Sequence, residues 1–204
     1  MIHILDYGLG NINAFLAMYK SLGIEASPAR SDEEMKEVEK LILPGVGAFD
    51  HAIDLLDSCE IRQSLERLVL VDKVPVLGVC VGMQILASCS EEGVRTGLGW
   101  LDARVRKLNS ISSFSSLPMP HMGWNDVISV DGSPLFRGIE ADAQFYFLHS
   151  YFFDCADVSN VAARADYGFS FDCAVHKENI YGVQFHPEKS HHWGATLLKN
   201  FAEL

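Results

Sequence analysis

The sequence predicts an α/β fold with a mixed, mainly parallel central sheet flanked by helices. Apolar runs of strand length alternate with helix-length amphipathic segments through the first half of the 204 residues, and this order gives parallel βαβ units. The second half is richer in strand-like runs, which we expect to add antiparallel strands to the same sheet. The length suits a single core, so we expect one domain over 1–204.

In the first half, breaker residues mark where the expected elements end. The strand-like runs lie at Ile2–Leu5, Leu41–Leu43 and Val74–Val79. The helix-like segments lie at Asn11–Leu22, Ile61–Val71 and Val81–Ala87. Gly23 is expected to stop the first helix, and the run Pro44-Gly45-Val46-Gly47 is expected to stop the second strand.

In the second half, the expected strands follow one another with few helical segments between them. They lie at Ala103–Leu108, Asn125–Val130, Gln144–His149, Phe171–Val175 and Ile180–Phe185. A last helix is expected from Trp193 to Phe201. The serine-rich run 110–116 is expected to be a surface loop, since it is polar and short.

Cys80 lies between a predicted buried strand and a predicted helix, in the run Gly78-Val79-Cys80-Val81-Gly82. This G-x-C-x-G pattern is a cysteine version of the nucleophile elbow, a sharp turn that strains the backbone and needs small neighbours. The macrodipole at a helix N-terminus favours the thiolate, which is the attacking form. We therefore expect Cys80 to be a nucleophile and the Val81 N–H to be an oxyanion donor. A buried structural cysteine is the alternative.

A general base must activate the thiol, and a third group must orient that base. Of the eight histidines, His186 alone follows a predicted core strand and precedes a Pro-Glu pair. The Glu188 carboxylate can set the tautomer of the imidazole and stabilise the imidazolium. Catalytic groups gather at the carboxyl ends of strands in such sheets, so we expect His186 to meet Cys80. A surface histidine at a strand end is the alternative.

Composition excludes several classes of protein. The formal net charge of −11 argues against nucleic-acid binding, which needs a basic face. Five cysteines without a CxxC pair argue against a disulfide framework and a structural zinc site, and they suit a reducing cytoplasm. We expect no signal peptide, no membrane span and no cofactor.

A metal site is also not expected, although His191 and His192 follow His186 closely. Adjacent histidines at a helix start do not share a face, and no cysteine or aspartate is placed to complete a ligand set.

With these motifs in place, the chain resembles class I (triad) glutamine amidotransferases, whose architecture is flavodoxin-like. More narrowly, it is similar to the glutaminase subunits of imidazole glycerol phosphate synthases. The resemblance extends over essentially the whole chain. Its motifs are Asp6-Tyr7-Gly8-Leu9-Gly10-Asn11, Pro44-Gly45-Val46-Gly47, Gly78 through Gln84, Pro120-His121-Met122-Gly123-Trp124-Asn125, Phe147-Leu148-His149-Ser150-Tyr151, and Gln184-Phe185-His186-Pro187-Glu188-Lys189-Ser190.

The resemblance implies a role for each matching position. Cys80, His186 and Glu188 would form a triad that hydrolyses L-glutamine through a glutamyl thioester. Val46 and Gly47 would belong to an oxyanion strand. The glutamine pocket would hold Gly47, Gln84, Glu92, His149, Ser150 and Tyr151. For Glu92, which suits an α-ammonium group, a solvated pair with Glu91 is the alternative.

The resemblance also implies a partner, a (β/α)₈ barrel synthase of histidine biosynthesis that receives the ammonia in a heterodimer. The positions near that docking face would be Asn11, Met122, Trp124 and Lys189. The histidines after Ser190 depart from the family pattern and leave a paralogue that supplies ammonia to a sugar-amidating enzyme as the alternative. A stand-alone cysteine hydrolase and a binding module without activity are the other hypotheses. The PGVG and HMGWN motifs argue against the former, and the intact triad argues against the latter.

Overall fold

The computed structural model describes residues 1–112, 117–130 and 132–204 and contains a mixed sheet with a parallel half. The order of its parallel strands is β2-β1-β3-β4-β13. Their bounds are Ala26–Ala29, Ile2–Leu5, Leu41–Leu43, Val76–Val79 and Ile180–Val183. The strand β2 forms one edge of the sheet and contains Pro28.

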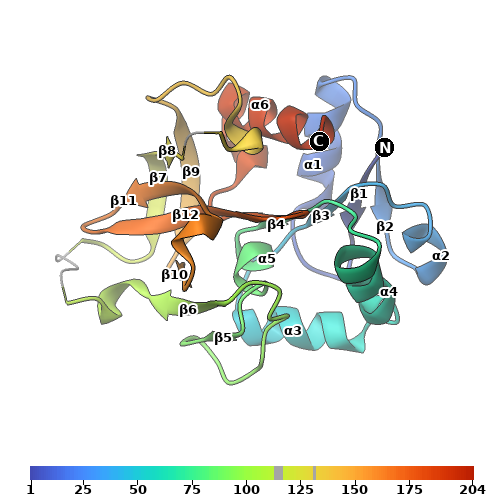
Figure 1. The fold of residues 1–204 in the computed structure, drawn as a ribbon, viewed down its shortest axis with the longest axis horizontal. Helices are drawn as coiled ribbons and strands as arrows, with labels where there is room; N and C mark the ends of the chain where they lie inside the picture. The colour runs from blue at the N-terminus through green and yellow to red at the C-terminus, as the bar shows by residue number, and fades with distance from the viewer. Residues whose placement is uncertain (113–116, 131) are drawn as a thin grey trace.

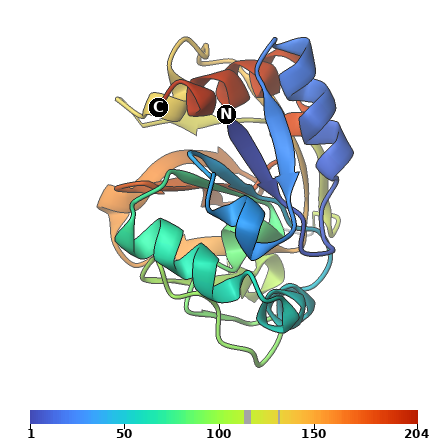
Figure 2. The same ribbon diagram turned by 90° about the vertical axis from the view of Figure 1, so that its right-hand side faces the viewer.

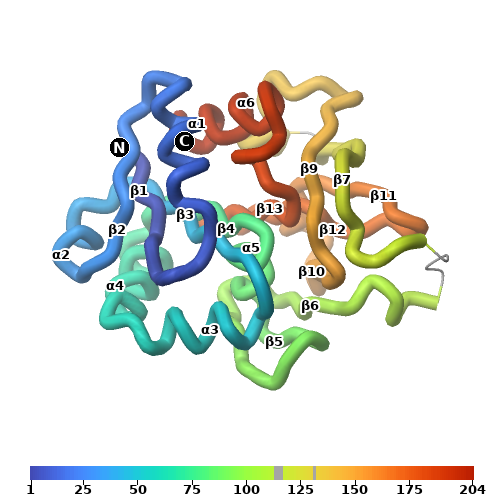
Figure 3. The backbone as a smooth tube through the Cα atoms, turned by 180° about the vertical axis from the view of Figure 1, so that it is seen from behind, coloured from blue at the N-terminus to red at the C-terminus, as the bar shows by residue number. Residues whose placement is uncertain are grey.

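The sheet continues beyond β13 with strands that are mostly antiparallel. The order is β12-β10-β6-β5, with bounds Ser170–Lys177, Tyr151–Cys155, Ala103–Lys107 and Cys89–Ser90. Two further strands, β11 (Val161–Asp166) and β8 (Ile128–Ser129), branch from β12. A separate antiparallel pair, β7 (His121–Asp126) and β9 (Gln144–His149), lies beside this half, as Figure 3 shows.

Helices cover both faces of the sheet, as expected for βαβ units. Figures 1 and 2 show α1 (Ile12–Ser21) and α6 (His191–Ala202) together on one face. The opposite face carries α3 (Phe49–Ser58), α4 (Arg62–Glu66) and α5 (Val81–Gln84). The short α2 (Asp32–Met35) follows β2. Between these layers the strands β1, β3, β4 and β13 are buried on both sides, which explains their largely apolar sequences.

Local sequence signals explain where the longer helices begin and end. The Asn11 side chain caps α1 by accepting a hydrogen bond from the Ala14 N–H at 3.1 Å. Gly23, with φ of 69°, follows the helix in a conformation that glycine adopts without strain. At the other end of the chain, Lys40 donates to the carbonyl of Ala202 near the end of α6, as expected for a cation at a helix C-terminus.

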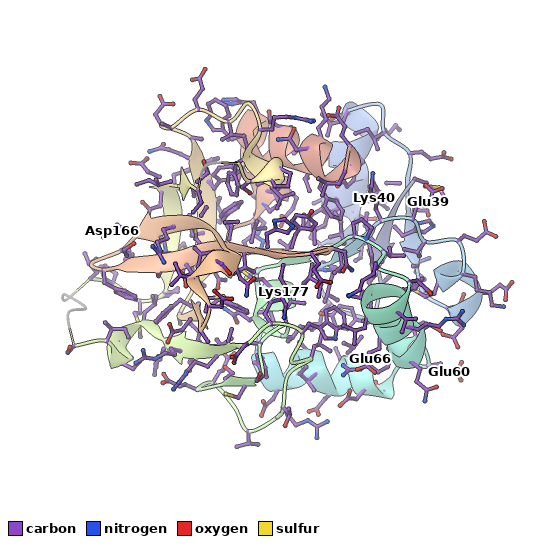
Figure 4. All side chains as sticks on the ribbon, in the orientation of Figure 1. Glu39, Lys40, Glu60, Glu66, Asp166 and Lys177 are labelled. Carbon is purple, nitrogen blue, oxygen red and sulfur yellow. The ribbon has the colours of Figure 1, made fainter. Side chains whose placement is uncertain are left out.

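Charged side chains lie mainly at the outside of the molecule. Figure 4 shows Glu60, which precedes α4, and Glu66, the last residue of α4, toward the outside of the molecule, whereas Lys40 lies beside the C-terminal helix. The largest buried side chains are aromatic, and they include Phe15, Phe49 and Phe145. This division between an apolar interior and a charged surface is the ordinary one for a globular fold.

Several predicted boundaries differ from the structure. The predicted strand Asn125–Val130 is wrong, because β7 ends at Asp126 and β8 joins a different sheet. The helix expected over Ile61–Val71 changes to π-helical geometry from Arg67, and the helix expected over Val81–Ala87 ends at Gln84. Of the loop expected over 110–116, residues 113–116 lie outside the described residues.

Candidate functional site

Cys80 occupies a sharp turn between β4 and α5, at the carboxyl end of a central parallel strand. Its φ of 55° and ψ of −113° lie outside the regions that side chains normally prefer, so the predicted backbone strain is present. The side chain is only 5% exposed. Val81 is the first residue of α5, so its N–H has no acceptor within the helix.

The two glycines that flank this turn have no space for a side chain. A Cβ atom at Gly78 would lie 2.6 Å from the carbonyl oxygen of Gly82. A Cβ atom at Gly82 would overlap the carbonyl group of Leu43 at the end of β3. The G-x-C-x-G pattern therefore reflects close backbone packing between the elbow and the neighbouring strand.

His186 and Glu188 lie together just after β13, the strand that neighbours β4. The Nδ1 atom of His186 is 2.9 Å from Oε1 of Glu188, and both side chains are at least 96% buried. The hydroxyl of Ser190 donates to the backbone carbonyl of His186 at 2.6 Å and holds the turn that follows. Because β4 and β13 are parallel neighbours, their carboxyl ends bring Cys80 and His186 together.

The environment of His186 favours its protonated form. Burial alone would lower its pKa, but hydrogen bonds to Cys80 and Glu188, together with the charges of both groups, outweigh it and raise the pKa to about 9. Cys80 and His186 also line the same cavity. A protonated imidazole between a thiol sulfur and a carboxylate can stabilise a thiolate and deliver a proton to a leaving group.

A cavity of about 280 Å³ opens over the Cys80 sulfur. Its lining includes all the residues that were expected in the glutamine pocket and the oxyanion site. The lining residues are Val46, Gly47, Cys80, Val81, Gln84, Glu92, Pro120, Leu148, His149, Ser150, Tyr151 and His186. Its size suits a small molecule such as an amino acid.

The position of Gly47 is open and has a positive φ. Gly47 has φ of 91°, and a Cβ atom placed there would meet nothing within 4 Å. Val46, which precedes it, is 41% exposed. The start of this segment is held more firmly, because the buried Tyr7 hydroxyl donates to the carbonyl of Pro44 at 2.8 Å. A glycine with open space beside it therefore follows a fixed anchor near the nucleophile.

Three of the expected pocket residues already bond to other protein groups. Both ring nitrogens of His149 are engaged, and the Gln84 amide nitrogen donates to protein carbonyls. The half-buried Glu92 carboxylate accepts a hydrogen bond from the Phe49 N–H at 2.8 Å, at the start of α3, which has no side-chain cap of its own. Glu92 is therefore tied into the fold, unlike a freely solvated glutamate.

Three residues near the sulfur carried no separate sequence prediction. Pro120 and Leu148 line the cavity. Gln184 is fully buried, and its amide nitrogen lies 3.8 Å from the Cys80 sulfur. Gln184 stands just after β13 and two residues before His186, in the same motif, but nothing in the sequence assigned it a role of its own.

The residues expected near a partner are exposed on the surface. Met122 is 65% exposed and Trp124 45% exposed, on the outward face of β7. The Trp124 ring stacks on the imidazole of His191 at 5.0 Å. Asn11 and Lys189 are also exposed, and the Lys189 ammonium lies 5.8 Å from the centre of the Tyr146 ring.

Metal-ion clusters and membrane-spanning helices are both absent from the described ranges 1–112, 117–130 and 132–204. No group of three His, Cys, Asp or Glu side chains in them is arranged to hold a metal ion. None of the helices in the same ranges has both the length and the apolar character that a membrane crossing requires.

Comparisons with known proteins agree with this geometry. The model of a family described as glutamine amidotransferase class-I matches residues 3–204. Imidazole glycerol phosphate synthase subunit HisH of Bdellovibrio bacteriovorus is 57% identical over 204 residues, with 100% of both chains covered. The protein of that name from Leptospira interrogans is 51% identical, again over 100% of both chains. A solved glutamine amidotransferase is 21% identical with a TM-score of 0.75, over 99% of this chain and 97% of that one, which confirms the predicted α/β fold.

Proposed function

The chain belongs to the class I glutamine amidotransferase family, and from this premise we propose that it is the glutaminase subunit of an imidazole glycerol phosphate synthase. As a member of this family it is an enzyme that hydrolyses glutamine. The observation that carries the proposal is the strained Cys80 beside the His186–Glu188 pair, within a cavity that fits an amino acid. The full-length relatives named as this subunit support the histidine pathway over sugar amidation.

In the first half of the proposed reaction, the Cys80 sulfur attacks the carboxamide carbon of glutamine. The carbonyl oxygen becomes an oxyanion, for which the Val81 N–H and a peptide N–H of the Val46–Gly47 segment are the proposed donors. His186, protonated at neutral pH because of its raised pKa, gives its proton to the leaving nitrogen. The C–N bond breaks, ammonia leaves, and a glutamyl thioester remains on Cys80.

In the second half, His186 accepts a proton from a water molecule that attacks the thioester carbon. The C–S bond breaks, and glutamate leaves with Cys80 restored. Glu188 holds the Nδ1 side of the imidazole throughout, so that Nε2 faces the reacting atoms. The remaining lining residues, among them Glu92, Ser150 and Tyr151, are proposed to bind the amino-acid end of glutamine.

The partner proposed for this subunit is a (β/α)₈ barrel synthase, with which it forms a heterodimer in the cytoplasm. Ammonia released into water would be protonated to ammonium and lost as a nucleophile, so a dry path to a second active site is needed. Exposed apolar side chains beside the pocket support docking there, since Met122, Trp124 and Leu148 are all more than a third exposed. The room around Gly47 supports gating, in which partner binding turns the oxyanion peptide toward the site.

The proposal is tested with Cys80→Ala, measured as glutamate release from glutamine with and without the barrel synthase and its ligand. Wild-type activity should be low alone and rise strongly in the complex, whereas Cys80→Ala should show none in either condition. Cys89→Ala, at an exposed cysteine away from the cavity, is the matched control and should behave as wild type.

A glutamine-like electrophile should also label wild-type protein once, at Cys80, as read by mass spectrometry. Turnover by Cys80→Ala would contradict the thioester route. Full activity of the isolated wild-type chain would contradict gating by a partner.

A further inference from the structure

The cavity wall is connected to strand β7 by a row of three hydrogen-bonded side chains, Asn125, His121 and His149, of which the first two have no part in the proposed reaction. Asn125 and His121 lie on the inward face of β7, opposite the outward Met122 and Trp124. His121 pairs in register with His149 at the end of β9. Both histidines are at least 94% buried, so their hydrogen bonds must be made with protein groups.

The orientation of the Asn125 amide is fixed by two backbone groups. Its nitrogen lies 2.7 Å from the carbonyl oxygen of Asp166, and its oxygen lies 2.9 Å from the Asp126 N–H. An NH₂ group can only donate. The same nitrogen lies 3.2 Å from Nε2 of His121, so Nε2 accepts a hydrogen bond, and the proton of a neutral His121 is on Nδ1.

The hydrogen bonds of His149, at the other end of the row, independently place the ring protons on the same nitrogens. Nδ1 of His149 lies 2.8 Å from the carbonyl oxygen of Tyr151, which can only accept. The His149 proton is therefore on Nδ1, and its Nε2 accepts from Nδ1 of His121 at 2.8 Å. Burial lowers the pKa of His121 to about 4 and that of His149 to about 3, so both rings are neutral and the two assignments agree.

Ring contacts hold His121 in this position. It stacks on Phe147 at 4.8 Å and on Tyr167 at 4.0 Å, with interplanar angles of 23° and 21°. A ring held between two others has little freedom to turn, so its hydrogen bonds keep their direction.

The row ends at the backbone of a residue that lines the cavity. Tyr151 lines the cavity, and its carbonyl also accepts a hydrogen bond from Gln84 at 3.1 Å. The Gln84 amide donates in addition to Gln184 at 3.0 Å, and the Gln184 amide points at the Cys80 sulfur. The Tyr151 carbonyl therefore accepts hydrogen bonds both from the row that starts on β7 and from Gln84, which contacts the residues around Cys80.

We propose that Asn125 and His121 are positioning residues for glutamine, because their hydrogen bonds, relayed by His149, fix the carbonyl of Tyr151 in the pocket wall. Neither residue lines the cavity, so their effect on glutamine is indirect. The inference rests on the proposed function for its ligand. It also gives the strand that carries Met122 and Trp124 a direct connection to the pocket.

The test is Asn125→Asp, which keeps the shape of the side chain and replaces a donor with an acceptor. Nitrogen NMR of the labelled full chain should find wild-type His121 and His149 both protonated at Nδ1. In Asn125→Asp the proton of each ring should move to Nε2. The unprotonated Nδ1 of His149 would then face the carbonyl oxygen of Tyr151, and neither atom could donate a hydrogen bond. In the complex with the synthase, the KM for glutamine should rise about tenfold or more, with kcat nearly unchanged, as expected when only binding is lost.

The matched control is Asp126→Asn, a change of one charge at the adjacent exposed position of β7, which should keep wild-type tautomers and KM. If Asn125→Asp does not fold, His121→Phe retains the ring stack without the hydrogen bonds and should raise KM in the same way. Unchanged tautomers in Asn125→Asp, or shifted tautomers with the KM of the control, would overturn the proposal. A wild-type complex that does not hydrolyse glutamine would instead overturn the proposed function, while the tautomers would still test the row.

Discussion

The proton on His186 is stabilised by a sulfur on one side and a carboxylate on the other. Its folded pKa of about 9 exceeds the ordinary value of 6.5. The protonated form therefore stabilises the folded state fully below pH 6.5, and this contribution is lost as the pH rises through about 9. At neutral pH the fold retains an imidazolium beside the nucleophile, which is the form needed to protonate a leaving amine.

We expect Glu188→Gln to lower the pKa of His186, because the negative charge beside Nδ1 is lost. The imidazole titration followed by NMR should therefore move to lower pH than in wild type. Wild type should have a higher unfolding free energy than the variant at low pH, and this difference should shrink as the pH rises toward 9. Glu203→Gln, at an exposed glutamate on the last residues of the chain, should leave the His186 titration unchanged.

Among single residues, the sequence predicted those that belong to a short local motif. Cys80 has flanking glycines, and His186 and Glu188 stand in a short motif, so each could be identified without a structure. Gln184 and the contact between His121 and His149 could not. The histidines are 28 positions apart, and only the register of β7 on β9 brings them together.

Among the elements, the elbow depends on how closely two backbones approach. Gly82→Ala should lower the unfolding free energy by about 3 kcal/mol or prevent folding, because the new methyl group overlaps the end of β3. Gly23→Ala, where φ is positive but the space is open, should cost only about 1 kcal/mol. Urea denaturation of both variants measures the difference, and equal losses would contradict the overlap between the Gly82 position and the end of β3.

The sequence predicted elements best where one pattern covered the whole segment. The strands Ile2–Leu5, Leu41–Leu43 and Gln144–His149 are confirmed with the predicted bounds. The helix α3 was missed although Phe49, Ala52, Ile53 and Leu56 have helical spacing, because it follows Ala48, which gives no capping signal. The strands β10 and β11 were also missed.

For the molecule as a whole, the pocket and the exposed side chains of β7 lie on the same side of the fold. Trp124→Ala should weaken binding of the barrel synthase by about 30-fold, as expected when an interface anchor worth about 2 kcal/mol is lost. Calorimetric titration measures this affinity. Val71→Ala, at an exposed position shortly before β4 begins, should leave the affinity unchanged. An equal loss of affinity in both variants would argue against docking through β7.

The sequence predicted that the sheet is mixed and mainly parallel, but it did not predict the full order of the strands. Alternating strands and helices indicated the parallel half, and the strand-rich second half indicated the antiparallel additions. The branch of β11 and β8, and the separation of β7 and β9 from the main sheet, depend on pairings between distant segments. No local pattern encodes such pairings, because each strand has the same period whichever neighbour it joins.

The proline at the outer edge of the sheet affects how copies of the chain meet. Ile2 and Asp6 donate to the carbonyls of Glu25 and Ala29, so odd-numbered residues of that edge bond inward and Pro28 faces outward. A strand from another molecule would find no N–H there, and the ring would obstruct its approach. Crowded copies therefore have a poor template for growing one continuous intermolecular ladder, which protects the protein from aggregating along this edge.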